Sequence, residues 1–273
     1  KYESVFCVNQ GNPNERLKAF LRAVLRVYAS TLSKEALMYR FQRGLLDHDE
    51  QMALLVQRVS GSVFGNLFFP LVSGVGLSHN PYSWSKKIDP ESGVIRIVCG
   101  LGTRAVDRHD DDYTRVVALN APQLTPEKNF DKFRQFAQKR IDVLDVDTNE
   151  FRFINFNDMR KKASDFPAEI ISSPAYENTQ VSLDYHDHWI LTFKKLLTET
   201  TFVANMQEML TTLQKAYEYP VDTEFTVNFK NDESYQINLL QCRPDIIEKY
   251  PFNLFDNLIR YLWATVRESF TLP

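Results

Sequence analysis

Glycine is scarce in this chain of 273 residues, which contains 9 glycines; average usage would give about 19. The scarcity excludes glycine-rich low complexity and repeated tight β-turns. The net charge is only −3, so the sequence lacks the basic excess that binding to a nucleic-acid backbone requires. Long apolar runs are also missing: no stretch approaches the length of about 18 residues that spans a membrane.

Cysteine is equally rare. Cys7, Cys99 and Cys242 are widely spaced and form no CxxC pair, which argues against a disulfide framework or a zinc site. Each lies in an apolar run, which predicts small, buried, reduced thiols and a cytoplasmic location. No signal peptide opens the chain, and its first residue is Lys1 rather than Met, so we expect a fragment of a longer protein.

Common catalytic motifs are absent too. The sequence has no GxSxG, no P-loop and no HExxH. Its five histidines lack metal-site partners at helical spacing, and we interpret His186-Asp187-His188 as a solvated turn. The acidic groups 110–112 and Asp142/Asp145/Asp147 are also interpreted as solvated loops, because the second group lacks the glycine and terminal glutamate of a calcium loop.

Apolar residues, including 20 phenylalanines, are spaced in a mixture of helical and strand patterns. Helical spacing predicts four helices, at about 13–28, 33–43, 201–218 and 246–273, the first capped by Asn12-Pro13. Apolar runs predict strands at 1–10, 52–59, 67–77, 94–99 and 114–119. The polar segment 123–165 is predicted to form peripheral loops and hairpins. Because strands and helices do not alternate strictly, the predicted fold class is α+β.

Residues 223–229 and 234–243 form the clearest hairpin pattern, with a turn near Asn231-Asp232. This turn places Glu224 opposite about residue 239, so Glu224 and Gln241 become diagonal neighbours and share one face with Arg243. A carboxylate, an amide oxygen and a guanidinium suit a site for Mg²⁺ and phosphate. The alternative is a solvated polar face in which Glu and Arg pair across the strands.

A glycine pair, Gly100 and Gly102, follows the strand at 94–99. The sequence GLGTRA formally matches the dinucleotide fingerprint GxGxxA. We reject that interpretation because no apolar helix pattern follows and no acid stands at the end of a second strand. Two glycines after a strand still let the backbone approach a ligand closely.

Motifs in one consistent order over residues 1–245 resemble the pyruvate/phosphoenolpyruvate-binding ATP-grasp domain of phosphoenolpyruvate synthase and pyruvate, phosphate dikinase. SGVGLSHNP at 73–81 resembles the family's SGVaFTrnP, and GLG at 100–102 with Asp112-Tyr113 resembles GLGE…PDxY. VDTEF at 221–225 and LQCRP at 240–244 resemble DIEW…IVQARP. Weaker similarities occur at 1–5, 28–40, 56–59 and 206–217.

The resemblance implies an ATP-grasp-like fold that is incomplete, because the family's N-terminal subdomain is missing. Residues 1–245 would form the partial nucleotide-binding domain, with 123–165 as a polar insertion and 246–273 as a C-terminal helix. A linking strand at 55–59 would meet the adenine, so that Gln57, Arg58 and Val59 seat the base of ATP.

The resemblance also assigns the phosphate side of the site. Gly100 and Gly102 would allow close backbone approach, Glu224 and Gln241 would bind Mg²⁺, and Arg243 would be the catalytic contact to phosphate. The implied activity is that of a dikinase-type phosphotransferase, which passes a phosphoryl group from ATP through a histidine on another domain to a small acceptor.

The sequence departs from the family pattern at several positions. Thr103 replaces the glutamate after GLG, and Arg58-Val59 replaces Lys-Met. The implied partners are ATP, a small-molecule acceptor, the missing subdomain and the phosphohistidine domain, so the fragment alone is expected to be inactive. The alternatives are a non-catalytic nucleotide-sensing or scaffolding module of the same fold, and a plain structural α+β domain.

Overall fold

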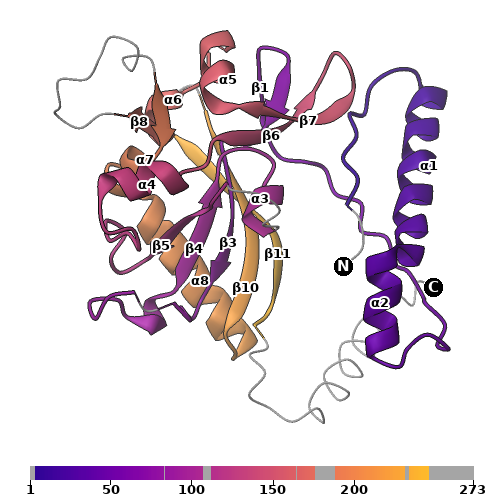
Figure 1. The fold of residues 1–273 in the computed structure, drawn as a ribbon, viewed down its shortest axis with the longest axis horizontal. Coiled ribbons are helices and arrows are strands. Elements are labelled where there is room, and N and C mark those ends of the chain that lie inside the picture. Colours follow the sequence, from indigo (N-terminus) through magenta and orange to yellow (C-terminus); the bar gives the residue numbers. More distant parts are fainter. Residues whose placement is uncertain are drawn as a thin grey trace, which may run out of the picture.

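The computed structural model describes residues 4–82, 84–106, 112–163, 165–175, 188–230 and 234–245. A five-stranded antiparallel sheet in the order β11-β10-β3-β4-β5 forms its centre (Figure 1). The strands are β3 (Val72–Leu77), β4 (Val94–Val98), β5 (Arg115–Ala118), β10 (Val221–Phe229) and β11 (Tyr235–Pro244). Sheets and helices in irregular order confirm the predicted α+β class, and the strands expected at 94–99, 114–119 and in the hairpin are present.

One face of this sheet is apolar and is covered by other elements. Ile95, Ile97 and Phe225 are buried there and belong to the main hydrophobic core. The helix α8 (Phe202–Tyr217) packs on the same core through buried Met206 and Leu210, as its helical spacing predicts. Burial of this side chain stripe is the main stabilisation of the helix, since each fully buried large apolar side chain contributes roughly 1.5–3 kcal/mol.

The opposite face of the sheet is more polar. The strand register sets Glu224, Val75 and Arg96 in one row, and Ser73 lies one step along the strand. The short helix α3 (Thr103–Val106) covers part of this face, where its Ala105 packs with Val75 in a small separate cluster. Side chains on this face are therefore available to line a cleft.

A second sheet has the order β1-β2-β6-β7, with β1 (Ser62–Phe64), β2 (Leu67–Phe69), β6 (Arg140–Asp145) and β7 (Glu150–Asn155). β6 and β7 pair as a hairpin, as the sequence predicted within 123–165, but the predicted peripheral placement is wrong, since β6 is fully buried apart from its first residue. Asp142 and Asp145 are buried on β6 rather than solvated, and Asp112 is buried as well. Their charges led to the prediction of an exposed segment, because carboxylates are seldom buried without partners.

The chain changes sheets inside the predicted strand 67–77, which is split by Pro70 into β2 and β3. The smaller elements are η2 (Pro90–Ser92), α4 (Phe130–Phe136), α5 (Phe156–Lys162), α6 (Ala168–Ile171) and α7 (Lys194–Thr198). The strands β8 (Ser172–Pro174) and β9 (Trp189–Leu191) pair separately. No helix among the described residues is long and apolar enough to cross a bilayer.

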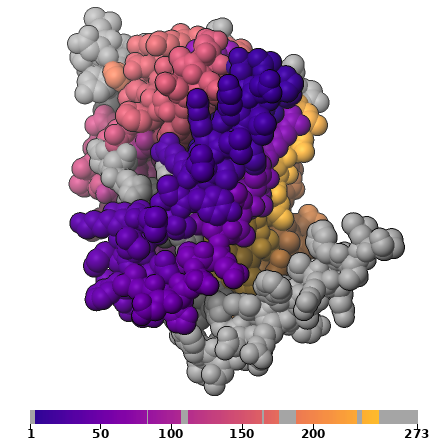
Figure 2. All heavy atoms as spheres, turned by 90° about the vertical axis from the view of Figure 1, so that its right-hand side faces the viewer, coloured from indigo at the N-terminus to yellow at the C-terminus, as the bar shows by residue number. Residues whose placement is uncertain are grey.

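The N-terminal helices α1 (Pro13–Ala29), η1 (Ser30–Leu32) and α2 (Lys34–Gln42) stand to one side of the sheets (Figure 1). Their atoms spread across one side of the molecule in Figure 2. Both predicted α-helices are present, and Asn12 caps α1 in a capping box with Glu15. Ala36 is the one buried residue among these three helices, so the unit packs loosely on the rest of the protein.

Several further expectations fail or fall outside the described residues. No strand forms at 4–10 or at 52–59, and Leu55 in the second segment is 77 % exposed. Its apolar run suggested a buried strand, but the segment lies at the open edge of a sheet. Cys7 is exposed, Cys99 is buried and Cys242 is half-buried, so the prediction of burial fails for Cys7. The turn at 231–232 and the helix at 246–273 lie outside the described residues.

Candidate functional site

A cleft of about 940 Å³ lies between the α1–α2 unit and the polar face of the five-stranded sheet. Ser30 and Ser33 line it from the helices, and Ser73 and Glu224 line it from the sheet. The segment that follows β4 adds Gly102, together with Leu101, Thr103 and Val106. The cleft therefore brings together Glu224 of the predicted hairpin site and Gly102 of the predicted glycine pair, whereas Gly100 does not line it.

Glu224 and Gln241 lie directly opposite each other on β10 and β11. The predicted diagonal arrangement is wrong, because the partner of Glu224 is two residues beyond the predicted position 239. One residue of this difference is already present at Phe225, which pairs with Leu239, and the register shift between Glu224 and Phe225 adds the other. Leu240 is the extra residue of this β-bulge, and it also lines the cleft. Glu224 is half-buried and Gln241 is exposed, so both oxygen donors are accessible.

Arg243 is opposite Asp222, one step along the same face. Its guanidinium donates to Asp222 Oδ2 at 2.6 and 3.0 Å. This hydrogen bond raises the pKa of Arg243, and burial together with the charge of Asp222 raises the pKa of Asp245. Asp222 Oδ1 is buried and has no hydrogen-bond partner in the described part of the chain. The sequence interpretation missed Asp222, although its two-residue spacing from Glu224 marked the shared face.

The glycine loop, residues 100–102, folds over the sheet. Gly100 and Gly102 have φ values of 104° and 86°, which favour glycine. A Cβ on Gly102 would lie 2.9 Å from Ser73 Cβ, and one on Gly100 would lie 2.7 Å from the Asp142 carbonyl oxygen. Ser73 Oγ donates to the Gly100 carbonyl at 2.6 Å. Both glycines are thus required for close approach, Gly102 at the cleft and Gly100 against β6.

Gln57, Arg58 and Val59 lie along the outer edge of β11, outside the lining of the cleft. Gln57 Nε2 donates to the carbonyl oxygen of Leu240, the bulge residue, at 3.1 Å. Ser60 Oγ accepts hydrogen bonds from Asn228 and Asn238 in the hairpin. The segment is therefore attached to the hairpin by side chains and makes no strand ladder.

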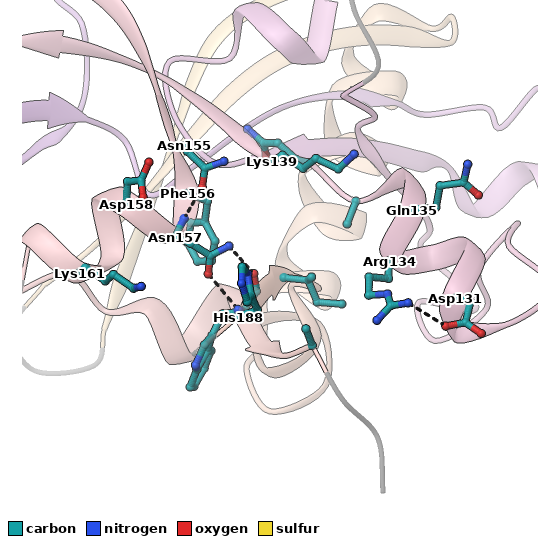
Figure 3. A pocket seen from close by; sticks show the side chains of 15 residues that line it. Asp131, Arg134, Gln135, Lys139, Asn155, Phe156, Asn157, Asp158, Lys161 and His188 are labelled. Carbon is teal, nitrogen blue, oxygen red and sulfur yellow. Dashed lines mark hydrogen bonds and ion pairs between the residues drawn. The ribbon is translucent and has the colours of Figure 1, made fainter. Parts of the chain in front are cut away.

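A second cavity, of about 810 Å³, lies between α4, the start of β6, α5 and β9 (Figure 3). Its charged lining includes Arg134, Lys139 and Lys161 as well as Asp131 and Asp158. Arg134 is paired with Asp131 at 3.3 Å, as the dashed line in Figure 3 marks. No residue predicted as part of the site lines this cavity, so the first cleft is the better candidate.

Glu224 on β10 lines the cleft, whereas Gln241 and Arg243 lie beside it on β11 and are not among its lining residues. Among the described residues, no group of three or more His, Cys, Asp and Glu side chains suits a metal ion. Two oxygen donors facing each other across a strand pair still match the way Mg²⁺ is held, through few protein ligands, several waters and a phosphate. The buried, unpartnered Asp222 Oδ1 on the same face fits this donor set.

Comparisons with known proteins address the family directly. A search of curated proteins gave no match to the chain. A family model described as pyruvate phosphate dikinase, AMP/ATP-binding domain, matches residues 1–250. The match includes the glycine loop, both strands of the hairpin and every element that lines the cleft. The chain therefore belongs to the family of pyruvate phosphate dikinase AMP/ATP-binding domains.

Proposed function

We propose that the cleft binds ATP for a phosphotransferase related to phosphoenolpyruvate synthase and pyruvate phosphate dikinase. The observation that carries the proposal is the placement of Glu224 opposite Gln241, beside the glycine loop, in a domain of an AMP/ATP-binding family. In this proposal the phosphates lie over the polar face of the sheet. The adenine lies toward Leu240 and the segment that contains Gln57, Arg58 and Val59.

Glu224 and Gln241 would hold Mg²⁺ through the carboxylate and the amide oxygen. A bound Mg²⁺ supplies charge neutralisation at the phosphates. Gly102 lets the loop pack closely on Ser73, where any side chain would clash, and so keeps its backbone at the wall of the cleft for the phosphates. Each of these roles depends on backbone geometry set by the bulge and by the positive φ values.

Arg243 is proposed as the residue that neutralises phosphate charge. Asp222 holds its guanidinium on the metal-ligand face, with two hydrogen bonds that fix its orientation. A guanidinium is charged at neutral pH, and the hydrogen bond to Asp222 raises the pKa of Arg243 further. Preorganised positive charge near a transferring phosphoryl group is the main source of catalysis in this class of reaction.

The phosphoryl group is proposed to pass to a histidine on another domain and then to a small acceptor. No described histidine lines the cleft, so the chain's own contribution is to bind, orient and neutralise ATP. The phosphohistidine domain and a further ATP-grasp subdomain would complete the machinery.

Calorimetric titration with a non-hydrolysable ATP analogue, with and without Mg²⁺, tests the proposal. The Glu224→Ala/Gln241→Ala variant should lose Mg²⁺-dependent binding and retain a folded thermal transition. Glu208→Ala/Gln236→Ala is the matched control, because it removes the same residue types from exposed positions on α8 and β11. This control should bind as the wild type does.

Two results would contradict the proposal. Wild-type protein that binds no nucleotide would exclude an ATP site. Equal Mg²⁺-dependent binding by both double variants would show that Glu224 and Gln241 do not bind the metal. Tight binding that needs no metal would instead favour the alternative of a non-catalytic nucleotide-sensing module.

A further inference from the structure

Arg104 lies behind the glycine loop and bridges two buried carboxylates. Its Nε donates to Asp142 Oδ1 at 2.9 Å, and its Nη1 lies 3.2 Å from Asp112 Oδ2. The side chains of Asp112, Asp142 and Arg104 are 1 %, 9 % and 14 % exposed. The three groups form a charged cluster that is almost entirely removed from water.

Both carboxylates are attached to the strand β6. Asp142 belongs to β6, and Asp112 accepts hydrogen bonds from the backbone nitrogens of Arg140 at 2.8 Å and Lys139 at 3.3 Å. The Arg140 side chain adds a further contact to Asp112 at 3.4 Å. Arg104 therefore connects the segment after β4 to β6 through charged hydrogen bonds, which are stronger than neutral ones.

The glycine loop is fixed to the same strand. Leu101 N donates to the Asp142 carbonyl at 3.0 Å, and Gly100 forms a parallel bridge with Asp142. The Thr103 hydroxyl donates to the second carboxylate oxygen of Asp142. Asp142 thus holds the residues before and after Gly102 with its backbone and its side chain, and Arg104 balances its charge.

Arg104 itself does not line the cleft, whereas Leu101, Gly102, Thr103 and Val106 do. Any effect of Arg104 on a nucleotide must therefore pass through the loop. Loss of the guanidinium would leave two buried carboxylates close together with less compensating charge, and they would relax by drawing in water or moving apart. Either change would displace the loop from Ser73 and alter the wall of the cleft.

We infer that Arg104 is a positioning residue for nucleotide binding: by bridging Asp112 and Asp142 it holds the glycine loop in the shape that receives the phosphates. The inference rests on the proposed function, because it concerns the same cleft. Arg104 directly follows Thr103, the position at which the loop departs from the GLGE pattern, and both residues bind Asp142.

The test compares nucleotide affinity and thermal stability in Arg104→Gln and Arg104→Lys. Arg104→Gln should raise the Kd for the Mg²⁺–ATP analogue by about tenfold or more. Arg104→Lys keeps the charge but loses the planar fork that spans two carboxylates, so its Kd should lie between those of the wild type and the glutamine variant.

Arg152→Gln is the matched control. Arg152 pairs at 2.5 Å with Asp145, which is also buried on β6, and neither residue lines the cleft. This variant should lower the thermal midpoint and leave the Kd within about twofold of the wild type. A structural effect shared by both arginines would instead move stability in both variants and Kd in neither.

A double variant tests whether Arg104 acts through Asp142. Asp142→Asn combined with Arg104→Gln should raise the Kd no more than the larger of the two single changes, because the two residues act as one unit. An unchanged Kd in Arg104→Gln and Arg104→Lys, with normal binding by the wild type, would overturn the inference alone. Absence of nucleotide binding by the wild type would overturn the proposed function as well.

Discussion

At the scale of single residues, the buried carboxylates of β6 form hydrogen bonds and ion pairs that fix neighbouring segments. Asp145 accepts hydrogen bonds from the backbone nitrogens of Thr148 and Asp147 at 3.1 and 3.0 Å and pairs with Arg152. The Thr148 hydrogen bond is the largest cause of the lowered pKa of Asp145. A carboxyl group whose pKa is lower in the folded state stabilises the protein above its unfolded pKa, and that stabilisation is lost as the pH falls through the folded pKa.

Asp145→Asn should therefore lower the urea midpoint at pH 7, and the difference from the wild type should narrow as the pH falls below about 4, where unfolded aspartates protonate. Urea unfolding at a series of pH values measures this. Asp131→Asn, at an exposed carboxylate, should change the midpoint little at any pH. A constant difference for Asp145→Asn across the pH range would contradict the assignment to ionisation.

Residue type alone misled the sequence interpretation at these positions. Asp112 and Asp142 resemble solvated acids in a one-dimensional pattern, and their burial depends on Arg140 and Arg104, which are 28 and 38 residues away in sequence. Partners far apart in sequence leave no periodic signal. Glu224 and Gln241 were identifiable because a hairpin brings its two strands together by local geometry.

At the scale of elements, local signals were reliable where they did not depend on distant partners. The Asn12 side chain accepts from the backbone nitrogens of Asn14 and Glu15, and Glu15 accepts in return from Asn12 N at 2.8 Å. This capping box begins α1 where the sequence predicted it. The prediction of a strand at 52–59 failed for a different reason. Whether an apolar segment joins a sheet depends on which sheet edge is free, and the segment's own residues do not encode this.

Asn12→Ala should destabilise α1 by about 1 kcal/mol, since two backbone donors lose their acceptor. No residue of α1 is buried, so the effect should stay local. Hydrogen exchange should show protection in the first turns of α1 reduced by about fivefold, with β4 and β10 unchanged. Asn14→Ala serves as the control, because Asn14 lies two residues further on in the first turn and its side chain does not cap the helix. An equal loss of protection in both variants would refute the role of the cap.

At the scale of the whole molecule, the α1–α2 unit presents apolar side chains to solvent. Leu25 and Leu32 are 68 % and 71 % exposed, and Leu17 and Leu21 continue the stripe along α1. Large exposed apolar patches on soluble proteins usually mark contact surfaces. We therefore expect this chain to self-associate as its concentration rises.

Light scattering over a concentration series measures this association. Leu25→Lys/Leu32→Lys should shift it to higher concentration, whereas Val63→Lys/Phe153→Lys, at exposed apolar positions on the second sheet, should not. A wild-type protein that stays monomeric at millimolar concentration, or an equal response of both variants, would contradict the expectation.

The bulge at Leu240 has a consequence for how related sequences should be aligned. Counted outward from the Phe229–Tyr235 pair, an uninterrupted ladder would place Gln241 opposite Thr223 and therefore on the apolar face, and the extra residue moves it opposite Glu224. Removal of Leu240 alone would leave Glu224 opposite Gln241, in an uninterrupted ladder. The number of residues separating these two positions can therefore vary between homologues while their pairing is kept, and a gap belongs at position 240 rather than in the turn.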